Sequence, residues 1–212
     1  LGSDISMVFD ECTSYPVSEE EAELSMQRTL RWAQRGRDRF LNLADRPASC
    51  DGEITNPGQA QFGIVQGANS PELRQRCAEE LVAMEFDGYA IGGVSVGEPE
   101  PEMMHAVEVT EPYLPADKAR YAMGLGTPAQ LVELVARGVD MFDCVLPTRV
   151  ARNGTAYTSG GAINLRAGHQ KEDFGPIEEG CDCFACKHHT RDYLRHLHKA
   201  GELLGQRMLR VH

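Results

Sequence analysis

The chain has 212 residues, of which 42% are apolar and 25% are charged, and its formal net charge is −11. These values are ordinary for a globular protein, and the negative charge argues against indiscriminate coating of nucleic acid while still permitting a local basic patch. No apolar run approaches the roughly 18–20 residues that a membrane-spanning helix needs, and the opening LGSDISMVFDE lacks the basic and apolar regions of a secretory signal. We therefore expect a cytoplasmic protein with no membrane partner.

The first part of the chain predicts one strand and one long helix. The stretch ISMVFD, residues 5–10, is typical of a strand. Ser18 and Glu21 are spaced as a capping box, which predicts a helix from there to about Phe40. Residues 41–60 contain Pro47, Asp51-Gly52 and Pro57-Gly58, which indicate a polar connecting loop.

Two later segments share a strand–helix–strand plan. In the first, strands are expected at 62–65 and 88–91; between them Ser70 and Pro71 open a helix whose apolar residues recur at helical spacing: Leu73, Cys77, Leu81 and Met84. In the second, strands are expected at 121–123 and 139–142. The helix between them starts at Thr127-Pro128, ends at Gly138, and has an apolar stripe of Leu131, Leu134 and Val135. This alternation predicts a parallel sheet.

Polar residues and glycines stand at the carboxyl ends of the expected strands, namely Asp10, Gln66, Gly92-Gly93, Met123-Gly124 and Asp143. In parallel α/β folds these ends meet on one face, where sites form. Asp143 follows the apolar residues of VDMFDCVLP, which we interpret as a buried strand stopped by Pro147, and a carboxylate there is costly unless something pairs with it. The alternative is that Asp10 and Asp143 only cap the turns that follow them.

The segment after Asp143 carries Arg149 and Arg152, which could neutralise phosphates near this face or be ordinary surface arginines. Asn153-Gly154 predicts a two-residue hairpin turn.

Three of the seven cysteines form the sequence CDCFAC, residues 181–186. A C-x-C-x2-C spacing indicates a metal site, with zinc as the first choice, and it suits reduced thiols better than a disulfide framework. A fourth ligand is needed, and the candidates are His188, His189, His196, His198 and His212. His188 and His189 would strain the site, and the spacing alone does not choose among the others.

Taken together, MVFDECTSYP, FGIVQG, EFDGYAIGGVSVGE, YAMGLGTP, GVDMFDCVLPTRVARNG and CDCFAC resemble the bacterial queuine tRNA-ribosyltransferases, or tRNA-guanine transglycosylases, in family order. The resemblance implies a (β/α)8 TIM barrel with a C-terminal zinc-binding subdomain. Residues 1–150 would form a partial barrel with the active-site face, 151–170 a β-hairpin connection and 171–212 the zinc subdomain.

The implied reaction is a pentosyl transfer on tRNAs with a GUN anticodon, in which wobble-position guanine is exchanged for 7-aminomethyl-7-deazaguanine on the way to queuosine. The implied enzyme is a cytoplasmic homodimer with structural Zn²⁺.

The resemblance also assigns residues. Asp143 matches the nucleophile that forms a covalent intermediate with the ribose. Asp10, Gln66, Gly93 and Met123 match the contacts to the base, Arg149 and Arg152 those to tRNA, and Cys181, Cys183, Cys186 and His212 the zinc ligands. Val96, like Cys12, fits the bacterial pattern; eukaryotic members have glycine at the Val96 position, which leaves room for queuine.

Members of the family begin before the segment LGSDISMVFDE, and the earlier part contains a DSGGFQ-type segment with a general acid/base Asp. We therefore expect this chain to be part of a longer enzyme and to lack turnover alone.

Three alternatives are an archaeal-type relative acting at another tRNA position, a zinc hydrolase on a barrel, and a zinc-containing accessory subunit that binds tRNA without catalysis. The presence of both Asp10 and Asp143 argues against the accessory subunit, and a closed cysteine-rich ligand set argues against the hydrolase.

Overall fold

The computed structural model describes residues 2–44, 56 and 58–212. The described residues form two compact units, one within 1–144 and the other within 145–212, and each is described by itself. The remaining residues, among them Pro47, Asp51-Gly52 and Pro57 of the expected polar loop, lie outside the described part.

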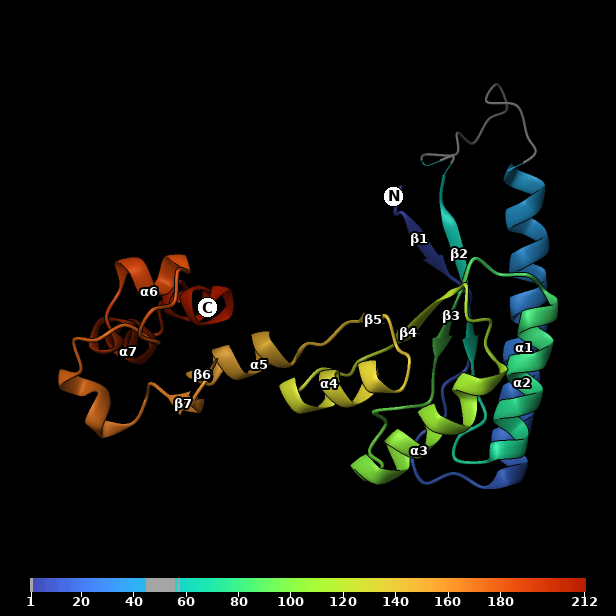
Figure 1. Ribbon diagram of the computed structural model, residues 1–212, viewed down its shortest axis with the longest axis horizontal. Helices are drawn as coiled ribbons and strands as arrows, with labels where there is room; N and C mark the ends of the chain where they lie inside the picture. Colours follow the sequence, from blue (N-terminus) through green and yellow to red (C-terminus); the bar gives the residue numbers. More distant parts are fainter. Residues whose placement is uncertain (1, 45–55, 57) are drawn as a thin grey trace. The chain divides into compact units, whose positions relative to one another are not determined.

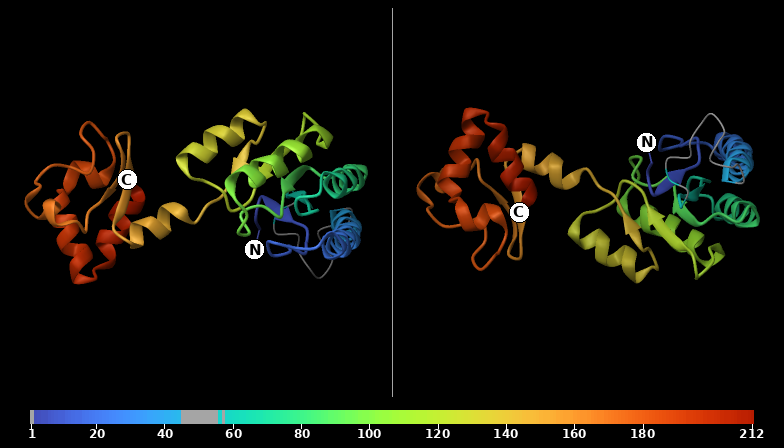
Figure 2. Two further views of the ribbon diagram at one scale, coloured as in Figure 1. Left: turned by 90° about the horizontal axis from the view of Figure 1, so that it is seen from below. Right: turned by 90° about the horizontal axis from the view of Figure 1, so that it is seen from above.

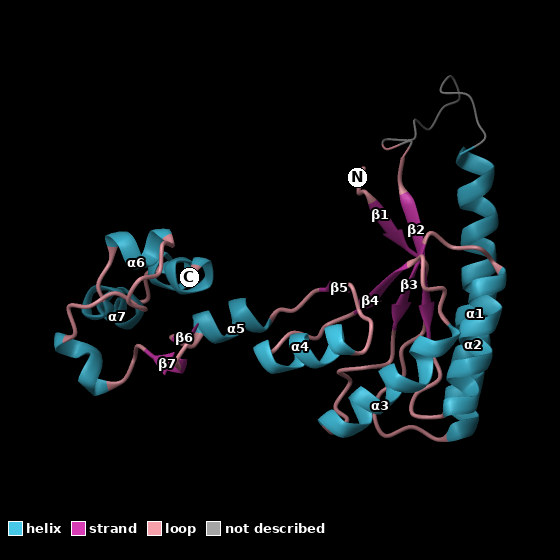
Figure 3. Cartoon of the chain, in the orientation of Figure 1, coloured by secondary structure: helices cyan, strands magenta, loops and turns pink. Residues whose placement is uncertain are grey.

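The first unit alternates strands and helices around one parallel sheet (Figures 1 and 3). Its elements are β1 (Ile5–Met7), α1 (Glu19–Ala44), β2 (Ala60–Val65), α2 (Pro71–Ala83), β3 (Gly88–Ile91), α3 (Glu100–Thr110), η1 (Glu111–Tyr113), β4 (Ala119–Ala122), α4 (Pro128–Ala136) and β5 (Met141–Phe142). The strands pair in chain order, β1-β2-β3-β4-β5, and every pairing is parallel. The described residues therefore confirm an α/β fold whose curled sheet makes half a barrel, and not a complete (β/α)8 barrel.

The helix starts predicted in the two strand–helix–strand segments are confirmed. Ser70 caps α2, its hydroxyl accepting a hydrogen bond from Leu73 N, and Pro71 occupies the first turn. Thr127 and Gln130 form a reciprocal capping box at the start of α4. These starts were predictable because capping depends on residues three positions apart.

Helix α1 begins as predicted, with the Ser18 hydroxyl accepting from Glu21 N at 3.2 Å, but it continues to Ala44 rather than ending near Phe40. The added residues include leucine and alanine, which favour helix, and the Asn42 side chain bonds the Asp38 carbonyl at 2.7 Å. The expected loop therefore begins at least four residues later than the sequence suggested.

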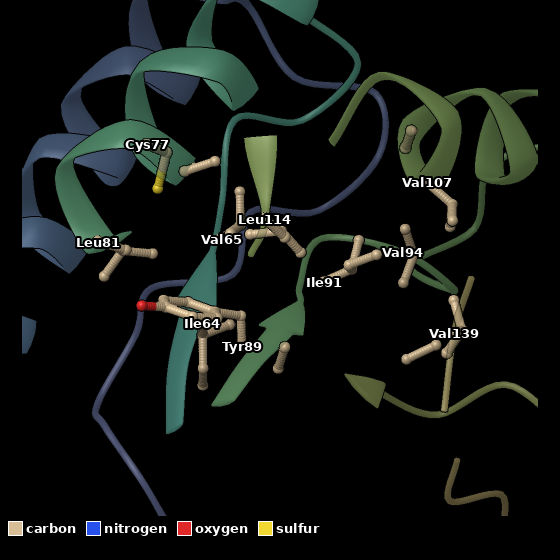
Figure 4. Packing of buried hydrophobic residues seen from close by; sticks show 14 of the residues in the cluster. Ile64, Val65, Cys77, Leu81, Tyr89, Ile91, Val94, Val107, Leu114 and Val139 are labelled. Carbon is tan, nitrogen blue, oxygen red and sulfur yellow. The ribbon is translucent and has the colours of Figure 1, made fainter. Parts of the chain in front are cut away.

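The core of the first unit lies between the sheet and its helices (Figure 4). Strand residues Ile64 and Ile91 pack against Leu81 of α2 and Val107 of α3, and all four are 1% exposed or less. The predicted face of α2 is buried at Leu73, Cys77 and Leu81. The predicted stripe of α4 is partly wrong, because Leu134 is buried whereas Val135 is 59% exposed.

The second unit contains α5 (Leu146–Arg152), β6 (Thr155–Thr158), β7 (Gly161–Asn164), η2 (Gly168–Glu172), α6 (Phe184–His188), α7 (Arg191–Ala200) and α8 (Leu203–Val211), which are visible in both views of Figure 2. Leu165, Ile177 and Leu194 are fully buried in its separate small core. The antiparallel β6–β7 pair forms a hairpin within the expected region, residues 151–170.

Two local expectations are wrong in this region. Asn153-Gly154 ends helix α5, with Gly154 at φ +84°, and the hairpin turn falls instead between Thr158 and Gly161. The strand before Asp143 has two half-buried residues, Met141 and Phe142, and Leu146-Pro147 starts α5 instead of ending that strand. Proline is tolerated in the first turn of a helix, so Pro147 carried no information about where the strand stops.

No helix in the described part of the chain combines the length and the apolar character needed to cross a bilayer.

Candidate functional site

The residues predicted at strand ends lie along one edge of the sheet. Gln66, Gly92 and Met123 come directly after β2, β3 and β4, Asp143 comes directly after β5, and Asp10 lies three residues after β1. Since the strands are parallel and adjacent in this order, their carboxyl ends share an edge. The structure thus brings these five positions to the same side of the first unit.

Asp10 and Gln66 are joined directly. The Gln66 side-chain nitrogen donates a 2.7 Å hydrogen bond to Oδ2 of Asp10. Gln66 is 2% exposed, and its backbone N–H bonds the buried Cys77 thiol at 3.2 Å. The residue is thus held at its backbone N–H and at its side-chain nitrogen, which fixes the direction of the amide.

Cys12 lies beside the same pair. Burial and the nearby Asp10 charge raise the pKa of the Cys12 thiol, and hydrogen bonds from the Gly93 backbone and the Gln66 side chain oppose this shift. The Cys12 thiol therefore interacts with Asp10, Gln66 and Gly93.

The Gly92-Gly93 pair is required by the close approach of Gln66. A Cβ at Gly92 would lie 2.6 Å from the Gln66 side-chain nitrogen, and one at Gly93 would lie 2.7 Å from its oxygen. Gly93 also has φ +64°, in the left-handed region that favours glycine. Any side chain here would displace the amide.

Asp143 is held by two donors at one oxygen. The Tyr121 hydroxyl donates to Oδ1 at 2.6 Å, and the Gly124 backbone N–H donates to the same atom at 3.0 Å. Burial, followed by the bond to Asp143, raises the pKa of Tyr121 to about 12, so the phenol remains a donor near neutral pH. Asp143 itself is exposed, and the expectation of a buried carboxylate is wrong in this structure.

Met123 is half-buried and packs against the core of the first unit. In the second unit, Arg149 and Arg152 are exposed in the last turn of α5, while Ala151 between them is buried. Their spacing of three places the two arginines on one helix face. They are available to an anionic ligand.

The four proposed metal ligands form one cluster. The sulfurs of Cys181, Cys183 and Cys186 lie 3.7, 3.5 and 3.3 Å from Nδ1 of His212, and all four ligand atoms lie within 4.8 Å of one another. This donor set of three thiols and one imidazole fits a tetrahedral metal ion such as zinc. The cluster could therefore hold a metal ion.

Side chains around the cluster support this fit. The His212 side chain is 3% exposed, and its other ring nitrogen lies 3.7 Å from a Glu178 oxygen, the kind of outer carboxylate that orients a ligating histidine. Burial raises the pKa of Cys183, but hydrogen bonds from the Cys186 amide, His212 and the neighbouring thiols together lower it to about 7. A thiol with this pKa readily gives the thiolate that binds metal.

The other candidate histidines have different neighbours. His188 and His189 pack against the rings of Phe184 and Tyr193, His198 bonds the Ala151 carbonyl at 3.0 Å, and His196 is exposed. The residue chosen by resemblance, His212, is the one that lies with the three cysteines.

Sequence reasoning missed two residues of this edge, Tyr121 as a partner of Asp143 and Arg74. Tyr121 pairs with Met141 in the parallel register, and Asp143 is two residues beyond Met141, so the strand period of two places both side chains on one face. Arg74 has no exposed area and donates to the carbonyl oxygens of Gly92 and Gly93. The sequence feature that could have revealed Arg74 is its position among Leu73, Cys77 and Leu81, on the buried face of α2.

The comparisons with known proteins agree on one family. The family model described as queuine tRNA-ribosyltransferase matches residues 1–212. The queuine tRNA-ribosyltransferases of Mannheimia succiniciproducens and Caldanaerobacter subterraneus subsp. tengcongensis are 50% and 52% identical to the chain over 212 residues, which is 100% of this chain and 53% of each relative. That of Shewanella denitrificans is also 52% identical, with the same coverage.

The chain thus spans about half the length of the curated relatives it matches. Because the family model covers every residue, the chain belongs to the queuine tRNA-ribosyltransferase family.

Proposed function

We propose that the protein is a tRNA-guanine transglycosylase, a pentosyltransferase that replaces guanine at the wobble position of GUN anticodons with 7-aminomethyl-7-deazaguanine in queuosine synthesis. The observation that carries the proposal is the sheet edge itself. Asp143, held by Tyr121 and Gly124, shares this edge with the Asp10–Gln66 pair in a chain of this family.

In the first step, a carboxylate oxygen of Asp143 attacks C1′ of the nucleotide. The C1′–N9 bond breaks, its electron pair leaves with guanine, and an aspartyl-ribose ester forms. The hydrogen bonds from Tyr121 and Gly124 both reach Oδ1, which makes Oδ2 the attacking atom.

In the second step, N9 of the incoming base attacks C1′, and the ester electrons return to Asp143. Two inversions retain the configuration at the sugar, as in a retaining glycosidase. Guanine gains a proton and the incoming base loses one, so the exchange is balanced. The resemblance assigns these proton transfers to the Asp of a DSGGFQ-type segment, which the 212 residues do not contain.

Base recognition follows from the donors and acceptors on the edge. The Asp10 carboxylate accepts from the N–H groups of the pyrimidine ring, and the Gln66 side chain and Gly93 amide donate to its carbonyl oxygen. Met123 covers one face of the ring. Guanine and its 7-deaza analogue share this pyrimidine edge, so one pocket serves both the leaving and the entering base.

The second unit would serve tRNA binding and stability. Arg149 and Arg152 contact phosphates of the anticodon loop, since exposed guanidinium groups on one helix face suit phosphate. Zinc held by Cys181, Cys183, Cys186 and His212 would cross-link α6 to the end of α8. Its role would be structural, because four protein ligands leave no open position for chemistry. The complete enzyme would be a cytoplasmic homodimer. Each subunit would contain a full (β/α)8 barrel, and residues 1–150 would form part of that barrel, including its active-site face.

The test is incorporation of labelled guanine into a tRNA with a GUN anticodon, with the full-length protein, Asp143→Asn and the control Asp140→Asn. Asp140 is three residues away and bonds the Arg120 N–H at 2.9 Å, before the strand rather than after it. We expect incorporation by the parent and by Asp140→Asn, and none by Asp143→Asn. Absence of incorporation by all three, with tRNA binding retained, would favour the non-catalytic accessory subunit.

A further inference from the structure

Arg74 of α2 is a charged side chain with no exposed area. Its guanidinium donates to the carbonyl oxygens of Ala68 at 2.5 Å, of Gly92 at 3.2 Å from both terminal nitrogens, and of Gly93 at 3.4 Å. None of the ion pairs formed by the described residues includes Arg74. The buried charge is therefore compensated chiefly by backbone dipoles.

Such an arrangement is a poor way to stabilise a fold. A buried charge without a counterion loses its hydration, and apolar side chains of similar volume serve as well or better in a core. Burial accordingly lowers the pKa of Arg74 to about 10. The arrangement calls for a role that an apolar side chain could not perform.

The carbonyls that Arg74 binds belong to the two segments that build the base side of the edge. Ala68 lies two residues after Gln66, in a left-handed conformation with φ +49°, and Gly92-Gly93 packs directly against the Gln66 amide. In a trans peptide the C=O and the following N–H point in opposite directions. Holding the Gly92 carbonyl toward Arg74 therefore turns the Gly93 N–H the other way, toward Cys12 and the site.

We propose that Arg74 is a positioning residue that fixes the direction of the Gly93 amide and the place of Gln66, and thereby sets affinity for the base rather than for tRNA. The inference rests on the proposed function, since the base is the ligand that this amide would bind. Arg74 reaches the base only through Gly93 and Gln66 and does not touch the reacting atoms.

The test compares Arg74→Lys and Arg74→Met with the parent in the full-length protein. Initial rates of guanine exchange are measured against the concentrations of guanine and tRNA separately. We expect the KM for guanine to rise about tenfold or more in both variants, which corresponds to the loss of one oriented hydrogen bond, and the KM for tRNA to stay within about twofold.

Arg37 supplies the matched control. It is 7% exposed and also donates to backbone carbonyls, those of Met84 and Glu85, but it has the Asp87 carboxylate at 3.3 Å and serves segments away from the strand ends. Arg37→Lys should lower thermal stability without changing the KM for guanine. Circular dichroism melting of all variants reports the structural effect independently.

The outcomes separate the two proposals. If the parent exchanges guanine but the Arg74 variants keep its KM for guanine, the inference is wrong and the proposed function stands. The inference is also wrong if KM for guanine rises equally in Arg37→Lys, or if both Arg74 variants fail to fold where Arg37→Lys folds, because Arg74 would then serve stability alone. If the parent does not exchange guanine, the proposed function falls and the inference falls with it.

Discussion

The Tyr121 hydroxyl donates a 2.6 Å hydrogen bond to Oδ1 of Asp143, from the end of β4 to the residue after β5. The bond forms because the parallel register pairs Tyr121 with Met141, two residues before Asp143. Both donors to the carboxylate, Tyr121 and the Gly124 amide, come from β4 or the turn after it. The position of the candidate nucleophile is therefore set by the neighbouring strand.

This bond predicts how the free energy of unfolding changes at alkaline pH. The pKa of Tyr121 is raised by burial and by Asp143 from 10.0 to about 12, so folding favours the neutral phenol. The stabilisation is fully present below the unfolded pKa of 10.0 and is lost as pH rises toward 12, where a phenolate would face a carboxylate. Tyr121→Phe should remove this loss.

The measurement is the free energy of urea unfolding from pH 8 to 12 for the parent, Tyr121→Phe and the control Tyr113→Phe, at a residue that is 37% exposed. The parent and the control should lose stability more steeply than Tyr121→Phe above pH 10. Parallel curves for all three would show that the Tyr121–Asp143 bond does not contribute to stability.

If the cluster of Cys181, Cys183, Cys186 and His212 holds a metal ion, replacing one of its cysteines should have a local effect. Cys183 caps α6, and its sulfur both accepts from the Cys186 N–H at 3.4 Å and lies 3.5 Å from His212. Cys183→Ala, or removal of metal with a chelator, should release α6 and the end of α8 while the sheet of the first unit stays folded. Metal content and hydrogen exchange of residues 171–212 are the readouts.

The matched control for this experiment is His196→Ala, because His196 is an exposed histidine outside the cluster. It should retain about one metal ion per chain, as a single four-ligand site would. A Cys183→Ala protein that is metal-free and shows parental exchange protection throughout 171–212 would contradict a structural role for the metal.

Close packing at Gly88 predicts a sizeable loss of stability on a minimal change. A Cβ at Gly88 would lie 2.3 Å from the ring of Phe62, with which it pairs across β2 and β3 and which is 3% exposed. Gly88→Ala should cost about 1–3 kcal/mol of unfolding free energy, because the ring has to move within a packed core. Gly168→Ala, at a position where no atom lies within 4 Å of the new Cβ, is the control for denaturant unfolding. Equal stability of the two variants would contradict the β2–β3 packing.

Short-range sequence signals predicted most of the helices and strands of the fold. Ser70, Thr127 and Gly138 were informative because a helix start or end depends on residues a few positions apart. The prediction that Val135 is buried was wrong, because helical spacing of an apolar residue does not show which other element covers it. The end of α1 was missed because no strong breaker lies between Phe40 and Pro47.

The strand-end rule predicted correctly that these positions share one edge of the sheet, but it did not predict their hydrogen-bond partners. That Gln66 would bond Asp10, 56 positions away, depends on the order of β1 and β2, which the sequence does not state. Arg74 was missed for a similar reason. Two of its three carbonyl acceptors are 18 and 19 residues further along the chain, and a charged residue on a helix is usually solvated.

Under the proposed function, Val96 predicts the size of base that the site would accept. It lines a small cavity with Tyr15, Gly93 and Glu98, and its N–H donates to Glu98 at 2.8 Å, so its backbone is fixed while its side chain occupies space. Val96→Gly should admit queuine, whose substituent is larger than aminomethyl, and Val96→Ala should give a smaller gain. Incorporation of queuine and of 7-aminomethyl-7-deazaguanine into tRNA is compared for each variant. Truncation of Val96 removes bulk without removing a polar partner. The rate at which the variants incorporate the smaller base should therefore stay within about threefold of the parent rate. Rejection of queuine by Val96→Gly, with exchange of the smaller base intact, would place the size limit elsewhere in the pocket.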